Sequence, residues 1–176
     1  MPAEDIERRW TDVAPDAHAA LGEAVRAAEA ALDPELLAVA RAAVEEGVLG
    51  RPAGPPPSGR RARAAAALAE QVVLYVPGVG DDLRDPACAL LGADGLRTFL
   101  EALYALEQQA RLAVAHRRLF GGPRVPASPE AGTGAAPSPA RAVRALHAAA
   151  MRLSALDPFT TEIVRLRAGS YHDCKT

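Results

Sequence analysis

The sequence DGLRTFLEALYALEQQARLAVAHRRLF, from Asp94 to Phe120, carries the strongest structural signal in this chain. Its large apolar residues recur at intervals of three and four positions, which predicts a long amphipathic helix with one inward face. The residues expected on that face are Leu96, Phe99, Leu100, Leu103, Leu106 and Leu112. The pair Gly121-Gly122 is expected to end the helix, since glycine readily adopts the left-handed conformation that closes one.

The composition of the whole chain agrees with a helical fold. The 176 residues are 49% hydrophobic, but only 4% are aromatic, and alanine is abundant. Alanine favours helix while contributing little buried area, so we expect tight helix packing with Leu and Val between the helices. β-branched residues are few and no long apolar/polar alternation occurs, which argues against strands. The predicted fold class is all-α.

Capping and breaking residues divide the chain into further helices. Asp33-Pro34 is typical of a helix start, with Asp as N-cap and Pro in the first turn, and Gly47 or Gly50 is expected to end that helix. The Pro- and Gly-rich stretch 52–59 is predicted to be a loop. The expected helices span about residues 16–32, 34–47 or 34–50, 61–75, 86–91, 94–120, 141–153 and 158–169. Residues 1–14 are expected to be a short polar lead-in.

The segment Pro77-Gly-Val-Gly-Asp-Asp82 contains a Gly-x-Gly sequence. It follows no predicted strand and opens no βαβ unit, so a dinucleotide-binding site is rejected in favour of a turn. No cofactor is predicted for this chain.

Charge and hydropathy restrict the partners. The formal net charge is −2, and the arginine clusters at 60–63 and 117–118 fall at predicted helix ends. Nucleic-acid binding is therefore not expected. No apolar run approaches the ~20 residues that a membrane span needs, and the acidic N-terminus lacks a signal sequence. A cytoplasmic location is predicted, in which two cysteines indicate chemistry or a buried thiol rather than a disulfide framework.

One short sequence occurs twice. Ala31-Leu-Asp-Pro34 recurs as Ala155-Leu-Asp-Pro158. The repetition predicts a duplicated helical unit, in which residues 1–121 form a first copy without redox residues. Residues 122–140, rich in Pro, Gly, Ser and Ala, form the expected linker. Residues 141–176 would begin a second, incomplete copy that carries the chemistry.

The chemistry in that last segment centres on Glu162 and Cys174. On the predicted helix, Glu162 lies at the margin of an apolar face formed by Phe159, Ile163 and Leu166, where lost hydration would raise its pKa and suit it to carry protons. The alternative is a helix-edge glutamate paired with Arg165. Cys174 follows the predicted helix end, and a thiol in the first turn of a new helix would be favoured as thiolate. The alternative is an incidental thiol near the chain end.

The stretches Glu162–Arg167 and His172–Thr176 resemble the signature of the carboxymuconolactone decarboxylase superfamily, in particular its alkylhydroperoxidase D-like (AhpD-like) branch. That signature has a glutamate, eleven intervening residues, Cys-x-x-Cys, and a histidine three residues later. Glu162 and Cys174 match its first two positions, while the second cysteine would be residue 177 and the histidine residue 181. Residues 69–76 and 99–104 resemble helices of the superfamily more loosely.

The resemblance implies an AhpD-like helical bundle, an oligomer that is often a trimer, and thiol-dependent reduction of hydroperoxides with a dithiol or protein-thiol reductant. It implies that the second cysteine of the motif, absent here, is the thiol that meets the peroxide, that Cys174 is its resolving or disulfide partner, and that Glu162 relays protons. His172 is suggested as a polar neighbour of this pair. The chain is expected to be truncated within the motif and impaired as it stands. A selenocysteine codon at position 177 that is read as stop would produce this end, as would a frameshift or a degraded gene.

Two alternatives to the peroxide reductase remain open. One is a non-catalytic helical oligomerisation scaffold, and the other is a lactone decarboxylase of the same superfamily, which needs no cysteine pair. No metal site is expected, because His172, Asp173 and Cys174 are adjacent in sequence and cannot all converge on one ion.

The remaining candidate residues have unremarkable interpretations. Cys88 is interpreted as a small buried hydrophobe. His18, His116 and His147 are interpreted as isolated surface or core residues, and Tyr171 as a packing residue.

Overall fold

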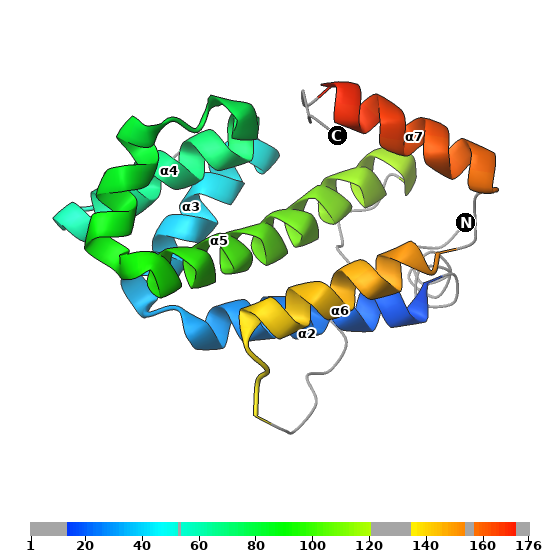
Figure 1. Cartoon of the computed structure of the whole chain (residues 1–176), viewed down its shortest axis with the longest axis horizontal. Helices are drawn as coiled ribbons and strands as arrows, with labels where there is room; N and C mark the ends of the chain where they lie inside the picture. Colours follow the sequence, from blue (N-terminus) through cyan, green and yellow to red (C-terminus); the bar gives the residue numbers. More distant parts are fainter. Residues whose placement is uncertain (1–13, 53, 121–134, 154–156, 172–176) are drawn as a thin grey trace.

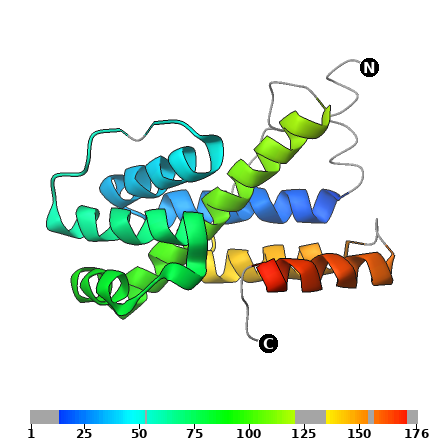
Figure 2. The ribbon, with the colours of Figure 1, turned by 90° about the horizontal axis from the view of Figure 1, so that it is seen from above.

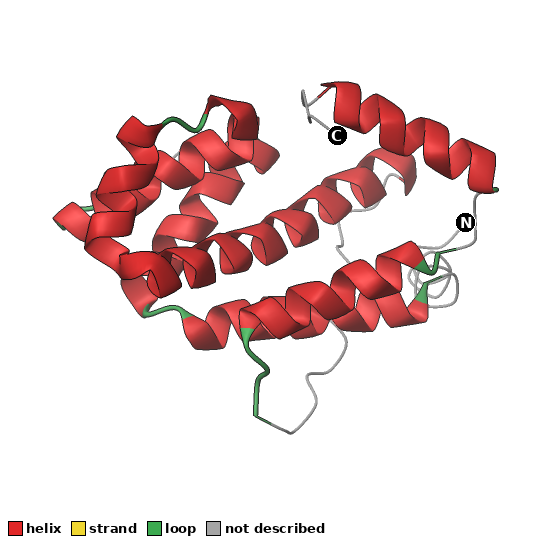
Figure 3. Cartoon of the chain, viewed as in Figure 1, coloured by secondary structure: helices red, strands yellow, loops and turns green. Residues whose placement is uncertain are grey.

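A computed structural model describes residues 14–52, 54–120, 135–153 and 157–171. This part of the chain is helical and contains no strand, which confirms the predicted all-α class (Figure 3). Its elements are α2 (Pro15–Ala31), α3 (Pro34–Leu49), α4 (Arg60–Tyr75), the short 3₁₀ helix η1 (Val76–Gly78), α5 (Asp81–Phe120), α6 (Pro139–Met151) and α7 (Pro158–Tyr171). None of the helices in the described ranges combines the length and apolar character needed to cross a lipid bilayer.

Both ends of α3 are set by single residues, as predicted. The Asp33 carboxylate accepts a hydrogen bond from the Leu36 backbone N–H at 3.0 Å, which satisfies one of the otherwise unpaired donors of the first turn. At the other end Gly50 has φ of 64°, and its N–H donates to the Glu46 carbonyl at 3.1 Å. A residue with a Cβ is strained in this left-handed conformation, so glycine ends the helix there.

Helix α5 (Asp81–Phe120) is interrupted by a kink at Gly92, where φ is 73° and ψ is 162°, so it consists of two helical parts. This confirms the predicted break between the helices expected at 86–91 and 94–120. That combination is essentially restricted to glycine. The first part begins earlier than expected and includes Pro86, which lacks an N–H for the carbonyl four residues before it but does not stop the helix.

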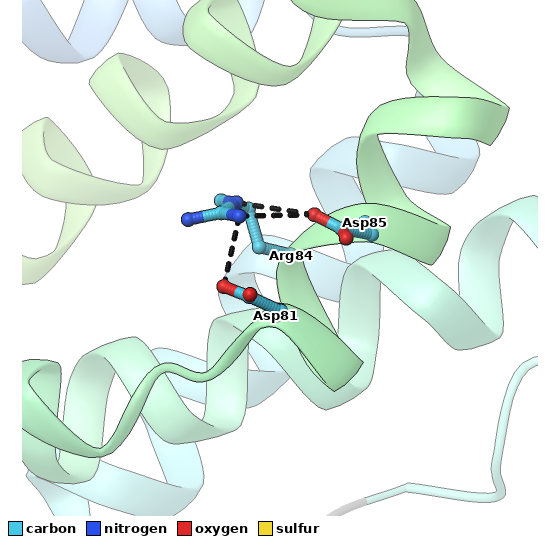
Figure 4. A network of polar contacts seen from close by, with 3 residues as sticks. All are labelled: Asp81, Arg84 and Asp85. Carbon is cyan, nitrogen blue, oxygen red and sulfur yellow. Dashed lines mark hydrogen bonds and ion pairs between the residues drawn. The ribbon is translucent and has the colours of Figure 1, made fainter.

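The early start of α5 agrees with the acidic residues in its first turn. Arg84 lies between Asp81 and Asp85, with distances of 2.8 Å and 3.2 Å between its Nη2 atom and their carboxylate oxygens (Figure 4). Aspartates in a first turn also face the positive end of the helix dipole. All three side chains are more than half exposed, so the network is expected to contribute little beyond fixing this helix start.

The core forms around α5, which runs from the α3–α4 pair past the α2–α6 pair (Figures 1 and 2). Phe99 and Leu103, both fully buried, lie at its centre and confirm the predicted inward face. Alanines on α2, α3 and α4 with no exposed surface allow the close helix packing that the composition predicts, among them Ala27, Ala28, Ala40, Ala62 and Ala65. A smaller cluster under the kinked start of α5 contains Leu68, Ala87 and Leu96.

Helix α6 belongs to this same core, although the sequence assigns it to a second unit. Ala142 and Leu146 join the main buried cluster, and α6 packs along α2 and against α5. It begins at Pro139, within the predicted linker, whose residues 122–134 lie outside the described ranges.

Helix α7 has a different environment. It makes no extensive contact with the other described helices. Its large apolar residues are exposed: Phe159 is 76% exposed, Leu166 57%, Val164 56% and Ile163 49%. The amphipathic pattern correctly predicts the helix, but the described helices do not bury its apolar side.

Candidate functional site

The start of α7 repeats the start of α3. Asp157 accepts a hydrogen bond from the Thr160 backbone N–H at 2.9 Å and another from the Thr160 hydroxyl at 2.5 Å, with Pro158 at the first helical position. These bonds lower the pKa of Asp157 below its ordinary value, the Thr160 side chain being the larger cause. Local interactions at Asp157 therefore set the start of the helix that carries Glu162.

Glu162 lies on α7 as predicted, but its surroundings are not those expected. Its side chain is exposed, and so are its apolar neighbours Phe159 and Leu166. The predicted desolvation of the carboxyl group is therefore absent in the described chain. Arg165, the alternative partner, has no described side chain, and Cys174 and His172 lie outside the described residues.

Chain length limits how Glu162 and Cys174 can meet. About 13 Å of helix separates Glu162 from the end of α7 at Tyr171. The three residues from there to Cys174 span at most about 10 Å when extended. The carboxyl group and the thiol can therefore approach each other within one chain only if the chain turns back along α7.

Cys88 lies in the first part of α5. It is partly buried and packs against the smaller cluster under the start of α5, close to Ala87 and Leu68. This agrees with its interpretation as a small hydrophobe. In the described ranges, moreover, no three His, Cys, Asp or Glu side chains gather closely enough to hold a metal ion.

The described residues also form a site that the sequence did not predict, a cavity of about 420 Å³ between α2, α5 and α6. Its polar lining comprises His18, Tyr104, Gln108, Arg111 and His147. The other lining residues are all apolar: Ala14, Ala17, Leu21, Leu112, Ala115, Leu146, Ala150 and Leu153. A largely apolar cavity of this size with a few converging polar groups is typical of a small-molecule site.

A histidine–tyrosine pair fixes one side of this cavity. The Nε2 atom of His147 on α6 lies 2.9 Å from the hydroxyl oxygen of Tyr104 on α5, and the rings meet edge to face with centroids 5.2 Å apart. Burial raises the pKa of Tyr104, and the nearby charge of Glu107 adds to the increase. Tyr104 therefore stays protonated at neutral pH and keeps a hydroxyl hydrogen that it can donate.

Arg111, two turns after Tyr104 on α5, is oriented by two partners. Its Nε and Nη2 atoms lie 2.7 Å and 2.6 Å from the Oε1 atom of Glu107, whose side chain is only 11% exposed. Its Nη2 also donates to the Val73 carbonyl on α4 at 3.3 Å. On α2, burial lowers the pKa of His18, which favours the neutral ring with one donor and one acceptor nitrogen.

The sequence offered little signal for this cavity. Each histidine stands alone on its helix, and residues 18, 104 and 147 come together only through the packing of α2 and α6 on α5. The one available hint was that the polar residues Tyr104, Gln108 and Arg111 recur at helical spacing along α5, beside its inward face.

A second hollow, of about 680 Å³, lies between α3, α4 and the loop containing Pro55–Pro57. Its charged residues, Glu35, Glu46 and Glu70, are all exposed acids. It lacks the varied, partly buried hydrogen-bonding groups of the first cavity, such as His18, Tyr104 and Gln108, so it is the weaker candidate.

Comparison with family models, with curated proteins and with solved structures found no match for this chain. The functional proposals therefore rest on its own residues.

Proposed function

We propose that this chain is a thiol-dependent hydroperoxide reductase of the AhpD-like type, with Cys174 as the redox thiol and Glu162 as the proton donor. The observation that carries the proposal is the spacing of these two residues, with Glu162 on a helix that begins at a fixed cap and ends before Cys174. Glu162 is exposed, so a peroxide in solvent can reach it, and the desolvation that would suit its carboxyl group to carry protons would have to come from a partner surface or from bound substrate.

The reaction balances with one cysteine and an external dithiol. The Cys174 thiolate attacks one peroxide oxygen, the S–O bond forms as the O–O bond breaks, and the departing alkoxide takes a proton from Glu162 and leaves as an alcohol. Sulfur is thereby oxidised to sulfenic acid. One thiol of the reductant then displaces water from that sulfur, and its second thiol releases Cys174 as the reductant closes into a disulfide. In the resembled family the attack on the peroxide is made by the second cysteine of the motif, at the position of residue 177 here, and the residue corresponding to Cys174 is its disulfide partner. In this proposal Cys174 takes over the attack.

The test uses both cysteines of the chain. Peroxide loss is measured with tert-butyl hydroperoxide and dithiothreitol, and the oxidised thiol is located by mass spectrometry. Cys174→Ser is expected to abolish turnover, whereas the matched control Cys88→Ser retains it. Glu162→Gln is expected to slow the reaction by roughly 100-fold, the lower end of what a positioned acid contributes.

Two results would refute the reductase proposal. One is oxidation of Cys88 in preference to Cys174. The other is a Cys174 reaction no faster in the folded chain than in the chain unfolded in urea, which would show that the fold does not activate this thiol.

The AhpD-like bundle and its duplication are part of the same proposal. They are supported by the two Leu-Asp-Pro helix starts, which share the same cap geometry at Asp33 and Asp157. Because such a cap is also a common local device, this support is limited to the helix starts.

An oligomer, with a trimer as the first expectation, is the proposed assembly. It is supported by the exposed apolar residues of α7 and by Met151, 82% exposed at the end of α6. Light scattering is expected to give a mass above that of one chain, and Phe159→Glu is expected to reduce it. Leu74→Glu on α4, where the leucine is 62% exposed, is the matched control and should leave the mass unchanged. A single-chain mass for the unaltered protein would refute the assembly.

A further inference from the structure

We propose that the cavity between α2, α5 and α6 binds a small monocarboxylic acid with an apolar body. Glu162 does not line this cavity, whose residues come from the helices that pack in the core. The proposal therefore stands or falls independently of the peroxide reductase.

The headgroup follows from the hydrogen-bonding groups on the wall. Arginine has only donors, and the amide of Gln108 and the ring of His18 can donate as well. The Tyr104–His147 pair uses one hydrogen in its own hydrogen bond and keeps another to donate. No aspartate or glutamate lines the cavity. A carboxylate accepts hydrogen bonds and donates none, so it complements this wall, whereas an amine would find no carboxylate partner.

The charged residues near the cavity favour a ligand with one negative charge over a ligand with two. Glu107 already engages the Nε and Nη2 atoms of Arg111, and the described chain shows no contact for Nη1. That nitrogen retains its donors for a ligand, but the carboxylate of Glu107 offsets much of the guanidinium charge. A dianionic phosphate would require more positive charge than this wall provides.

The other lining residues indicate the size and polarity of the rest of the ligand. Eight of the lining residues are alanine or leucine, and they line the cavity from all three helices. A volume of about 420 Å³ lies at the small end of the range for small-molecule sites. A medium alkyl chain or a single aromatic ring fits both the size and the apolar character of this space.

The test compares three probes with the same alkyl chain: octanoate, 1-octanol and octylamine. Calorimetry with the 176-residue chain at neutral pH is expected to show octanoate binding at least tenfold more tightly than 1-octanol, and octylamine not binding. Equal affinity for the three probes, or tighter binding of octylamine, would refute the carboxylate headgroup. Absence of any binding would refute the site.

Variants show whether binding occurs in this cavity. Gln108→Ala is expected to weaken octanoate binding about tenfold, the effect of losing one hydrogen bond to a charged group. Gln109→Ala, a change of the same type at a residue that does not line the cavity, is the matched control. Leu112→Trp should fill the space and remove binding of every probe while the helical circular dichroism is retained. Octanoate affinity unchanged in both Gln108→Ala and Leu112→Trp would place binding elsewhere and refute the proposal.

Discussion

The sequence Leu-Asp-Pro occurs at the start of both α3 and α7, and both helices have the same aspartate cap. The two helices differ in how their apolar residues are packed. Asp33 and Asp157 each accept a backbone N–H from the third residue of their helix, at 3.0 Å and 2.9 Å. Helix α3 then buries Leu36, Val39 and Val44 against α4 and α5, and α7 leaves its apolar residues exposed. A cap therefore determines where a helix begins, whereas its partner surface determines how much it contributes to stability.

The largest expected difference between the packed bundle and α7 concerns their phenylalanines. Phe99→Ala removes a fully buried ring and should lower the free energy of unfolding by about 3–5 kcal/mol. Phe159→Ala removes a ring that is 76% exposed and should change it by less than about 0.5 kcal/mol. Urea unfolding followed by circular dichroism measures both. Equal effects at low protein concentration would mean that α7 packs as firmly as the bundle.

Substitution of the two capping aspartates should give the next largest difference in stability. Asp33→Ala should cost about 1–2 kcal/mol, because the cap is lost from a helix that unfolds with the core. Asp157→Ala should leave the unfolding midpoint unchanged and instead accelerate amide hydrogen exchange over residues 158–171. A shift of the midpoint by Asp157→Ala equal to that of Asp33→Ala would contradict the distinction between these helices.

The end of α3 offers a smaller effect with a clear control. A Cβ added at Gly50 would meet no atom within 4 Å, so Gly50→Ala tests the positive φ alone and should destabilise by about 1 kcal/mol. Gly54 in the following loop is equally open and has no positive φ, so Gly54→Ala should be neutral. Thermal unfolding of the two variants checks the difference, and a neutral Gly50→Ala would contradict the assigned backbone conformation.

The smallest expected effect is a pH dependence at Asp33. The hydrogen bond from Leu36 is the main cause of its lowered pKa, and Arg61, whose Nη1 atom lies 2.7 Å from the carboxylate, contributes. Because the folded-state pKa lies below the unfolded one, this contribution is present above the unfolded pKa and disappears as the pH falls through the folded one.

The variant Asp33→Asn retains a capping side chain but not the charge. It should therefore be less stable than the unaltered protein at pH 6, and the difference should vanish toward pH 2. Asp157→Asn should show no such dependence in global unfolding. A difference for Asp33→Asn that stays constant with pH would show that the charge is irrelevant at this cap.

Much of the local structure could be predicted because it depends on neighbouring residues. Asp33, Pro34 and Gly50 set the limits of α3 as expected, and the periodic leucines identified the buried face of α5. The start of α5 could not be predicted in the same way. Pro86 normally marks a helix start, but here the aspartates of the first turn begin the helix five residues earlier.

Long-range contacts account for what the sequence did not reveal. His147 and Tyr104 are hydrogen-bonded across 43 positions, and nothing near either residue in sequence indicates the other. The exposure of Glu162 could not be predicted because an expected long-range contact of its helix is missing from the described chain. Its amphipathic helix implies an apolar partner, but a periodic pattern does not show whether that partner exists.

The pairing of α2 with α6 has a consequence for synthesis. All of the chain between Ala31 and Pro139 must be made after α2 and before α6, which takes about 5 to 20 s at ordinary elongation rates. During that time α2 can pack on α5 once α5 has emerged, while the surface that later meets Leu146 remains open. A nascent chain halted before Pro139 should thus be a better target for hydrophobic chaperones than the finished protein.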